Sequence, residues 1–318
     1  MMFGIYLVYV LLAGGLITTI LSAMRNEKTG VTPALITLLI SWVITISLLG
    51  RNPSLEYGLV FNDYTNFFSI VFLIVASFAL ISMLEEKKGS IMGLSLLSTG
   101  AMVALVAAND LLTILVAFKA MAIPLIIGVA MSKEKLSKEA AIKFFVLSIL
   151  SAALLIYGVA LLGSASGSFI LSDIVAGAQN APTAQVLLAL VFIFTGLAVE
   201  IAVVPFHIWM PDTYQGSYPP LASILAASTK KAGFAVAFKI LLIALPFLKF
   251  FWSDLFLYFA IITMTFGNLL ALRQPNLKRM LAYSSIAHAG YIMMGLAASS
   301  EPAIAGSLLQ IINHSILT

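Results

Sequence analysis

The stretch from Leu111 to Met131, LLTILVAFKAMAIPLIIGVAM, is almost wholly apolar and contains one charged residue, Lys119. A helix needs about 20 apolar residues to cross the hydrocarbon core of a bilayer. Lys119 lies near the middle of the stretch, where a charge costs roughly 2.5 to 3.5 kcal/mol on insertion scales and usually faces an ion or proton path inside the protein. The stretch therefore predicts a membrane-spanning helix with a buried functional charge.

Two further apolar runs are interrupted in the same way, by Glu200 and by Lys230. At a rise of about 1.5 Å per residue, Lys119, Glu200 and Lys230 lie about 12, about 20 and about 16 Å into their predicted helices. All three are close to the middle of the membrane. We predict that they form a proton pathway in one polar layer.

The composition leaves one fold class. Of the 318 residues, 61% are hydrophobic and only 9% are charged, whereas a soluble domain has about 25% charged residues. Soluble α/β enzymes are excluded, because their apolar segments are shorter than the runs found here. The sequence predicts an all-α polytopic membrane protein, a bundle of about eleven transmembrane helices.

The residue types also restrict the chemistry. The chain has no cysteine, which excludes disulfides and cysteine-ligated iron–sulfur clusters within it. No Gly-rich phosphate loop and no metal-ligand spacing occurs. We therefore expect no cofactor and no metal in this chain, and any redox centre in a partner. The net charge of +4 is attributed to membrane orientation rather than to nucleic-acid binding.

The apolar runs are bounded by polar turns. We predict helices over 3–24, 31–50, 65–84, 91–108, 111–131, 140–163, 186–206, 219–245, 250–272 and 280–298, and an eleventh from about 302. The 51–64 segment has room for a short extended piece, and a Pro-rich polar stretch separates the seventh and eighth spans. We divide the chain into a three-helix segment (1–90), a first five-helix repeat with the charge layer (91–245) and an incomplete second repeat (246–318).

Basic residues are distributed unequally between the two sets of loops. Loops after odd-numbered spans hold Arg25, Lys28, Lys87, Lys88, Lys133, Lys135, Lys138, Arg273, Lys278 and Arg279, against Arg51 and Lys249 in the others. The positive-inside rule then predicts an N-terminus outside and basic loops in the cytoplasm. We separately expect the chain to be a multi-pass protein of the plasma (cytoplasmic) membrane of a prokaryote. The first segment lacks a basic n-region, so it is interpreted as a retained helix and not a signal peptide.

Two interpretations of the buried charges stay open. Lys119 and Glu200 either form a static ion pair that fixes helix packing, or they belong to a path for protons. The additional Lys230, Lys231 and Lys239 favour the path. Lys230 and Lys231 point about 100° apart on a helix, so only one of them can face Glu200. Lys239, about 13 Å further on, either continues an exit route or extends to the interface.

A proline and three histidines complete the set of candidates. Pro205 follows Glu200 by five residues and is predicted to break the seventh helix beside the buried charge. His207 and His288 are either proton relays or packing residues. His314 lies close to the C-terminal end of the sequence, and we assign it no role.

Three motifs carry a family resemblance. They are VPFHIWMPDTYQG from Val204, ASTKKAGFA from Ala227 and NLKRMLAYSSIAHAGY from Asn276. The chain resembles the antiporter-like, proton-pumping subunits of complex I, Mrp-type antiporters and membrane-bound hydrogenases. Tyr214–Gly216 and Ser228–Lys230 look most like the N-type subunit of NADH:quinone oxidoreductase. The resemblance implies fourteen helices with two inverted five-helix repeats, each built around a broken helix and a central lysine.

The chain departs from that family pattern in two ways. Family members usually carry a glutamate in the fifth helix and a lysine in the seventh, whereas this chain has Lys119 and Glu200 at those positions. Opposite charges attract equally after their exchange, so our hypothesis is that the pair is kept and that Glu200 carries the proton. The eighth-helix lysine matches Lys230. The family's later helices are absent after Thr318, so a partner chain or a further segment would supply them.

Three functions follow from the resemblance. The first is a proton-translocating, antiporter-like subunit of a complex I-like assembly, with other membrane subunits as partners. The second is a component of an Mrp-type Na⁺/H⁺ antiporter or a membrane-bound hydrogenase, for which Na⁺ is the additional ion. The third is a scaffold subunit that does not pump, which the exchanged charges and the missing helices would explain.

Overall fold

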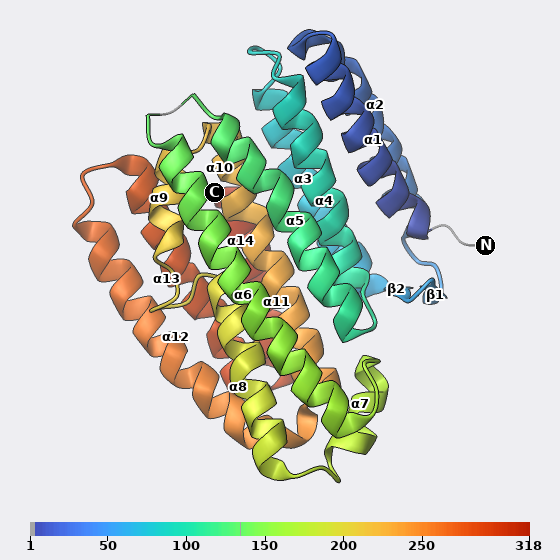
Figure 1. Cartoon of the computed structure of the whole chain (residues 1–318), viewed down its shortest axis with the longest axis vertical. Coiled ribbons are helices and arrows are strands. Elements are labelled where there is room, and N and C mark those ends of the chain that lie inside the picture. Colours follow the sequence, from blue (N-terminus) through green and yellow to red (C-terminus); the bar gives the residue numbers. More distant parts are fainter. Residues whose placement is uncertain (1–3, 134) are drawn as a thin grey trace.

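The computed structural model describes residues 4–133 and 135–318. These residues form a bundle of helices and one short β-hairpin (Figure 1). The helices are α1 (Gly4–Met24), α2 (Val31–Leu48), α3 (Asp63–Ser82), α4 (Gly89–Ala107), α5 (Leu111–Met131), α6 (Ser137–Ser166), α7 (Leu171–Ala178), α8 (Thr183–Glu200), α9 (Trp209–Gly216), α10 (Pro219–Ile224), α11 (Lys230–Lys239), α12 (Lys249–Leu272), α13 (Leu277–Ala298) and α14 (Glu301–Leu317). The hairpin pairs β1 (Ser54–Glu56) with β2 (Leu59–Phe61).

Shorter helical turns connect several of these elements. Glu27–Gly30 and Pro246–Leu248 are 3-10 turns, and Leu225–Thr229 and Ile240–Ala244 are π-helical turns on either side of α11. The hairpin is the short extended piece expected between residues 51 and 64. The first predicted span began at residue 3, which lies outside the described residues, and the structure describes this helix from Gly4.

The all-α membrane fold class is confirmed, but the count of eleven spans is not. Within residues 4–133 and 135–318, nine helical segments are long and apolar enough to cross a membrane. The last two predicted spans correspond to α13 and α14, which are not among the nine. Polarity explains the difference for α13, which contains Lys278, Arg279 and His288, and length explains it for the 17-residue α14.

Polar side chains begin several of the helices. The side chains of Asn62, Asp110 and Asn276 accept hydrogen bonds from backbone N–H groups in the first turns of α3, α5 and α13, at 3.0, 2.8 and 3.2 Å. Each therefore satisfies a donor that has no partner within the helix. Asp110 in this way sets the start of α5 and the height at which Lys119 lies.

Successive long helices run in opposite directions, so their loops lie alternately at the two ends of the bundle. Figure 1 shows the loops that follow α1, α3, α5 and α12 at its upper end. These are the loops that hold the basic residues named above. The structure thus gathers the basic loops at one end, as the predicted topology requires.

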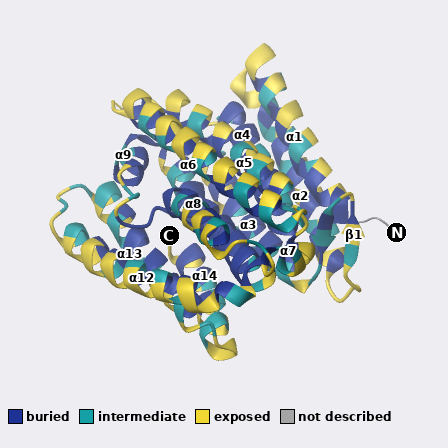
Figure 2. Ribbon diagram, turned by 60° about the horizontal axis from the view of Figure 1, so that its bottom comes forward, coloured by how far each residue is buried: buried dark blue, intermediate teal, exposed yellow. Residues whose placement is uncertain are grey.

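Lys230 and Lys231 lie on one of the most buried segments of the bundle. In the apolar stretches of α4 and of the segment Pro219–Ala244, 89% of the residues are buried, against 22% in the segment that contains α12. In Figure 2 the exposed faces belong to outer helices such as α1, α6 and α12. Lys230 and Lys231 therefore lie at the centre of the bundle.

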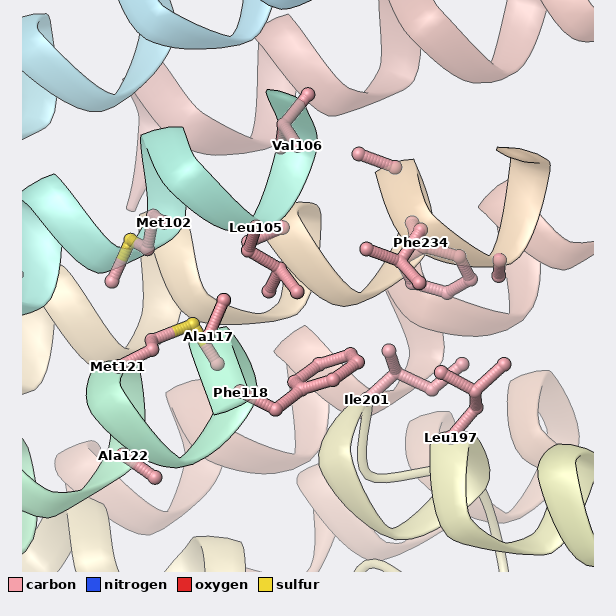
Figure 3. Close-up of a cluster of buried hydrophobic side chains, with 14 of the residues drawn as sticks. Met102, Leu105, Val106, Ala117, Phe118, Met121, Ala122, Leu197, Ile201 and Phe234 are labelled. Carbon is pink, nitrogen blue, oxygen red and sulfur yellow. The ribbon is translucent and has the colours of Figure 1, made fainter. Parts of the chain in front are cut away.

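An apolar cluster ties together the helices that carry the charges (Figure 3). Leu105 of α4, Phe118 of α5, Leu197 of α8 and Phe234 of α11 pack in it, and Ile201 follows the end of α8. Within a bilayer, close van der Waals packing rather than removal from water drives such contacts. The cluster fixes the helix positions immediately beside the charges, since Phe118 precedes Lys119 in the sequence.

Candidate functional site

Lys119 and Glu200 form a direct ion pair. Lys119 Nζ lies 2.6 Å from Glu200 Oε1. The same ammonium group donates to the carbonyl and the hydroxyl oxygen of Ser148 at 2.8 and 3.0 Å, and Ser151 Oγ donates to Glu200 Oε1 at 2.8 Å. The side chain of Lys119 is 26% exposed, against 5% for Glu200. The carboxylate is thus the inner member of the pair.

Helix α6 places both serines at the pair. Ser148 and Ser151 are three residues apart and so lie on one face of the helix. Helix α8 approaches this face closely at Gly196, where an added Cβ would lie 2.5 Å from Leu155 Cγ. Because glycine has no Cβ, Ser151 Oγ also comes within 3.1 Å of the Gly196 carbonyl oxygen. Packing of α6 against α8 therefore positions the pair.

The helix that carries Glu200 is broken, as predicted. Helix α8 ends at Glu200 itself, and residues 201–208 are not helical before α9 begins at Trp209. The predicted span continued to residue 206. It ends earlier because Ala202 adopts a left-handed conformation with φ of 56°, so the backbone has left the helix three residues before Pro205. Trp209 Nε1 donates to the carbonyl oxygen of Val199 at 3.0 Å, which also accepts from the Ala202 N–H at 3.2 Å.

Lys230 does not contact Glu200. Its Nζ is 3.1 Å from Ser285 Oγ on α13, and its side chain is buried. Among residues 4–133 and 135–318, no carboxylate lies within 4.0 Å of Lys230. The sequence left open which of Lys230 and Lys231 faces Glu200, and within the described residues neither forms an ion pair with it. The sequence indicates the depth of a residue but not how its helix is rotated.

Lys231 has a separate set of partners, as the 100° offset from Lys230 requires. Its Nζ lies 2.6 Å from the Ala226 carbonyl oxygen and 2.7 Å from His314 Nδ1. The π-helical turn Leu225–Thr229 contains this carbonyl, and single π-helical turns within α-helices often occur at functional sites. The rings of His314 and His288 are 4.5 Å apart, and His288 Nδ1 lies 2.6 Å from Gln310 Nε2.

Sequence reasoning missed the role of His314. The depth of His314 in the membrane could have identified it as a candidate. His314 lies about 20 Å along the helix that begins at Glu301, and this is the depth predicted for Glu200. His288 was recognised as a candidate but not as part of a group. The structure thus joins Lys231, His314 and His288 into one cluster of titratable side chains.

Lys239 caps a helix and contacts none of these charges. Its Nζ donates to the carbonyl oxygens of Val106, at 2.9 Å, and Ala108 at the end of α4. A cation is favourable there because the helix dipole is negative at the C-terminus. Lys239 also lines an open cavity of about 230 Å³ together with Tyr64 and Asn109.

His207 lies in the broken segment between α8 and α9. Its Nδ1 is buried and has no hydrogen-bond partner within the described part of the chain. Its ring stands edge-on to that of Tyr283, with centroids 6.0 Å apart. His207 therefore makes a packing contact with Tyr283.

A second group of charges, which sequence reasoning did not identify, lies at the end of the bundle with the basic loops. Asp212 on α9 is bonded to Lys143 of α6 and to Arg279 of α13. Burial of Asp212 acts to raise the pKa of its carboxyl, but the hydrogen bonds from Lys143 and Arg279 outweigh burial and hold the pKa below its ordinary value. Beside the group, Gln215 lines an open cavity of about 660 Å³.

No metal centre is found among the described residues. No group of three or more His, Asp or Glu side chains in residues 4–133 and 135–318 is placed to hold a metal ion.

The apolar helices, the broken helix and the mid-depth charges define a polytopic membrane protein with an antiporter-like fold. Residues 108–318 match the family described as NADH:quinone oxidoreductase/Mrp antiporter, TM. The chain belongs to this family, which confirms the resemblance seen in its motifs.

Among curated relatives, the chain is 35% identical over 289 residues to NADH-quinone oxidoreductase subunit N of Trichlorobacter lovleyi, covering 87% of this chain and 58% of that protein. It is 36% identical over 263 residues to F(420)H(2) dehydrogenase subunit N of Methanosarcina mazei, covering 80% of this chain and 53% of the relative. The chain thus spans little more than half the length of these relatives.

Solved structures agree with the fold. A chain of respiratory complex I from Thermus thermophilus superposes with a TM-score of 0.82 at 29% identity, covering 96% of this chain and 67% of that one. A chain of the Mrp complex from Dietzia sp. has a TM-score of 0.89 at 17% identity, covering 100% and 63%. The second likeness concerns the fold alone.

Proposed function

We propose that this chain is a proton-translocating, antiporter-like membrane subunit of a complex I-type, NADH:quinone oxidoreductase-like assembly. Its relatives named subunit N support the assembly type. The observation that carries the proposal is the buried Lys119–Glu200 pair at 2.6 Å, on the same broken-helix framework as the central lysines. Charges are retained at such depth mainly where they serve ion or proton movement.

In this proposal Glu200 is the proton carrier. The Ser148 oxygens are alternative acceptors for Lys119, so the ammonium group can move away from Glu200 without losing every partner. Ser151 continues to donate to Glu200 while the carboxylate gains and then loses a proton. Because Lys230 does not contact Glu200, transfer to Lys230 requires bound water or a movement of the side chains.

The second half of the path consists of Lys230, Lys231, His288 and His314. Lys231 Nζ and His314 Nδ1 are 2.7 Å apart, so a proton can pass between them without separating an ion pair. The His288 ring lies beside that of His314, with centroids 4.5 Å apart and planes tilted by 60°. We assign Lys239 to helix capping and His207 to packing. Neither is needed for transfer in this proposal.

The proposal also covers the setting of the chain. The protein is placed in the plasma membrane of a prokaryote with its N-terminus outside and its basic loops in the cytoplasm. Other membrane subunits are its partners, and they or further segments complete the fold and hold the redox centres. The chain itself holds no cofactor. The division into residues 1–90, 91–245 and 246–318 remains a prediction.

The experiment is Glu200→Gln in the complete assembly, reconstituted in vesicles. We expect electron transfer to continue with fewer protons pumped per electron than in the parent. The matched change Glu301→Gln, at an exposed carboxylate, should leave the number of protons per electron unchanged. The assay is repeated with and without Na⁺. Unaltered pumping in Glu200→Gln would show that Glu200 is no carrier, and pumping that requires Na⁺ would favour an Mrp-type exchange.

A further inference from the structure

Asp212 joins three helices with one carboxylate. Its Oδ2 lies 2.6 Å from Lys143 Nζ on α6, and its Oδ1 accepts from Arg279 Nη1 on α13. Arg279 Nη1 also donates at 3.1 Å to Oε1 of Gln215, which lies with Asp212 on the short helix α9. The Asp212 side chain is 25% exposed. Both carboxylate oxygens are thus used, each for a different neighbouring helix.

Helix α9 is in turn fastened to the residue before Glu200. Trp209, one turn before Asp212, stacks on Phe144 of α6 with ring centroids 4.5 Å apart and planes 6° apart. The indole N–H of Trp209 donates to the Val199 carbonyl oxygen. A displacement of α9 therefore moves Val199, and Glu200 follows it directly in the chain.

The mid-depth charges form a set with two halves. The first half of this charge set is the Lys119–Glu200 pair, and the second is the group of Lys230, Lys231, His288 and His314. The two helices bound by Asp212 carry neutral partners of both halves. Helix α6 supplies Ser148 and Ser151 to the Lys119–Glu200 pair. Helix α13 supplies Ser285 to Lys230. The spacing between α6 and α13 thus decides whether both sets of hydrogen bonds form together.

We propose that Asp212 is a positioning residue for proton transfer, which holds α6, α9 and α13 at the spacing that both halves of the charge set require. This inference rests on the function proposed above for the same charges. An ordinary surface ion pair contributes little to stability. Asp212 differs because its two oxygens bind separate helices.

Glu139 provides a matched control. It also binds Lys143, at 2.7 Å, but it lies on α6 itself and its side chain is 60% exposed. Glu139→Gln therefore removes a carboxylate from the same lysine without removing a link between helices. Asp212→Asn removes a carboxylate that links helices, with little change in shape.

The test measures the rate of proton pumping and the infrared band of the Glu200 carboxylate in the complete assembly, the band being the one lost in Glu200→Gln. In Asp212→Asn we expect the band to shift and pumping to slow about tenfold, since displacing a reacting group by about 1 Å can cost up to a hundredfold in rate. Asp212→Glu should restore much of the rate. Glu139→Gln should change neither quantity.

A parent-like band and pumping rate in Asp212→Asn would overturn the inference. If Asp212→Asn does not assemble, Lys143→Gln is used instead, because it removes only the link to α6. It should shift the Glu200 band in the same direction. An unshifted band in Lys143→Gln would also overturn the inference. The proposed function fails separately, when Glu200→Gln itself pumps like the parent. If Glu200→Gln loses pumping while Asp212→Asn pumps like the parent, the proposed function stands and only the positioning role of Asp212 is ruled out.

Discussion

The two halves of the charge set balance their charges differently. Lys119 is neutralised by Glu200 at 2.6 Å. Lys230 and Lys231 instead have a serine hydroxyl, a backbone carbonyl and a histidine as partners. An ion pair resists separation in a medium of low dielectric constant, whereas neutral partners exchange a proton without separating opposite charges. The first half therefore suits a gate that opens by moving charges apart, and the second suits transfer.

The largest expected effect is on the ion pair. Lys119→Glu places two carboxylates together, and breaking a buried pair costs about 3 to 5 kcal/mol. We expect the variant to lose most of its thermal stability and all pumping. The double variant Lys119→Glu/Glu200→Lys restores opposite charges in the order usual for the family, and should recover the stability. The measurement is the thermal-unfolding midpoint in detergent, followed by pumping in vesicles.

A loop variant separates this effect from charge reversal in general. Lys135→Glu reverses an exposed charge and should leave the unfolding midpoint close to that of the parent. If Lys119→Glu is as stable as Lys135→Glu, the Lys119–Glu200 ion pair does not stabilise the first half of the charge set. The proposed difference between the two halves would then be wrong.

The second half should lose function more than stability. Lys231→Met leaves His314 Nδ1 and the Ala226 carbonyl without their partner but leaves no carboxylate unpaired, so we expect a cost of about 1 to 3 kcal/mol. Proton translocation should fall as far as in Glu200→Gln. Parallel measurements of the unfolding midpoint and of pumping check this. Destabilisation equal to that of Lys119→Glu would contradict the assignment of neutral partners.

A smaller change sharpens the same contrast. Ser285→Ala removes the hydroxyl that contacts Lys230 and should cost about 0.5 to 1.5 kcal/mol, with pumping reduced but not abolished. Ser285→Thr keeps the hydroxyl and should pump faster than Ser285→Ala. Equal rates for the two variants would show that the hydroxyl does not serve Lys230.

The sequence was sufficient to predict the membrane fold, the ion pair and the break in α8. A charge within a long apolar run is rare enough that Lys119 and Glu200 stood out, and Pro205 marked the broken segment. The contacts of Lys230 were not predictable, because apolar periodicity is weak in helices that are buried on most sides. Helix rotation, which decides that Lys230 meets Ser285 and Lys231 meets His314, depends on packing.

The polar partners were hidden for a related reason. Serines such as Ser148 and Ser151 are common in membrane helices, where they usually bond their own backbone, so neither was singled out. Asp212 lies within a family motif that the sequence did identify, but its bonds to Lys143 and Arg279 join residues far apart in the chain. Such contacts follow from the tertiary fold and leave no local pattern.

The smallest expected effect concerns pH and lies outside the mid-depth charges. Because Lys143 and Arg279 hold the pKa of folded Asp212 below the unfolded value of about 3.9, the bridge stabilises the fold fully above that value. Its contribution is lost as the pH falls through the lower, folded-state pKa. Thermal-unfolding midpoints measured from pH 7 downward should therefore fall less steeply in Asp212→Asn than in the parent at the acid end. Parallel curves would show that Asp212 does not link α6 to α13 in the folded protein, while the contrast between the two halves of the charge set would be unaffected.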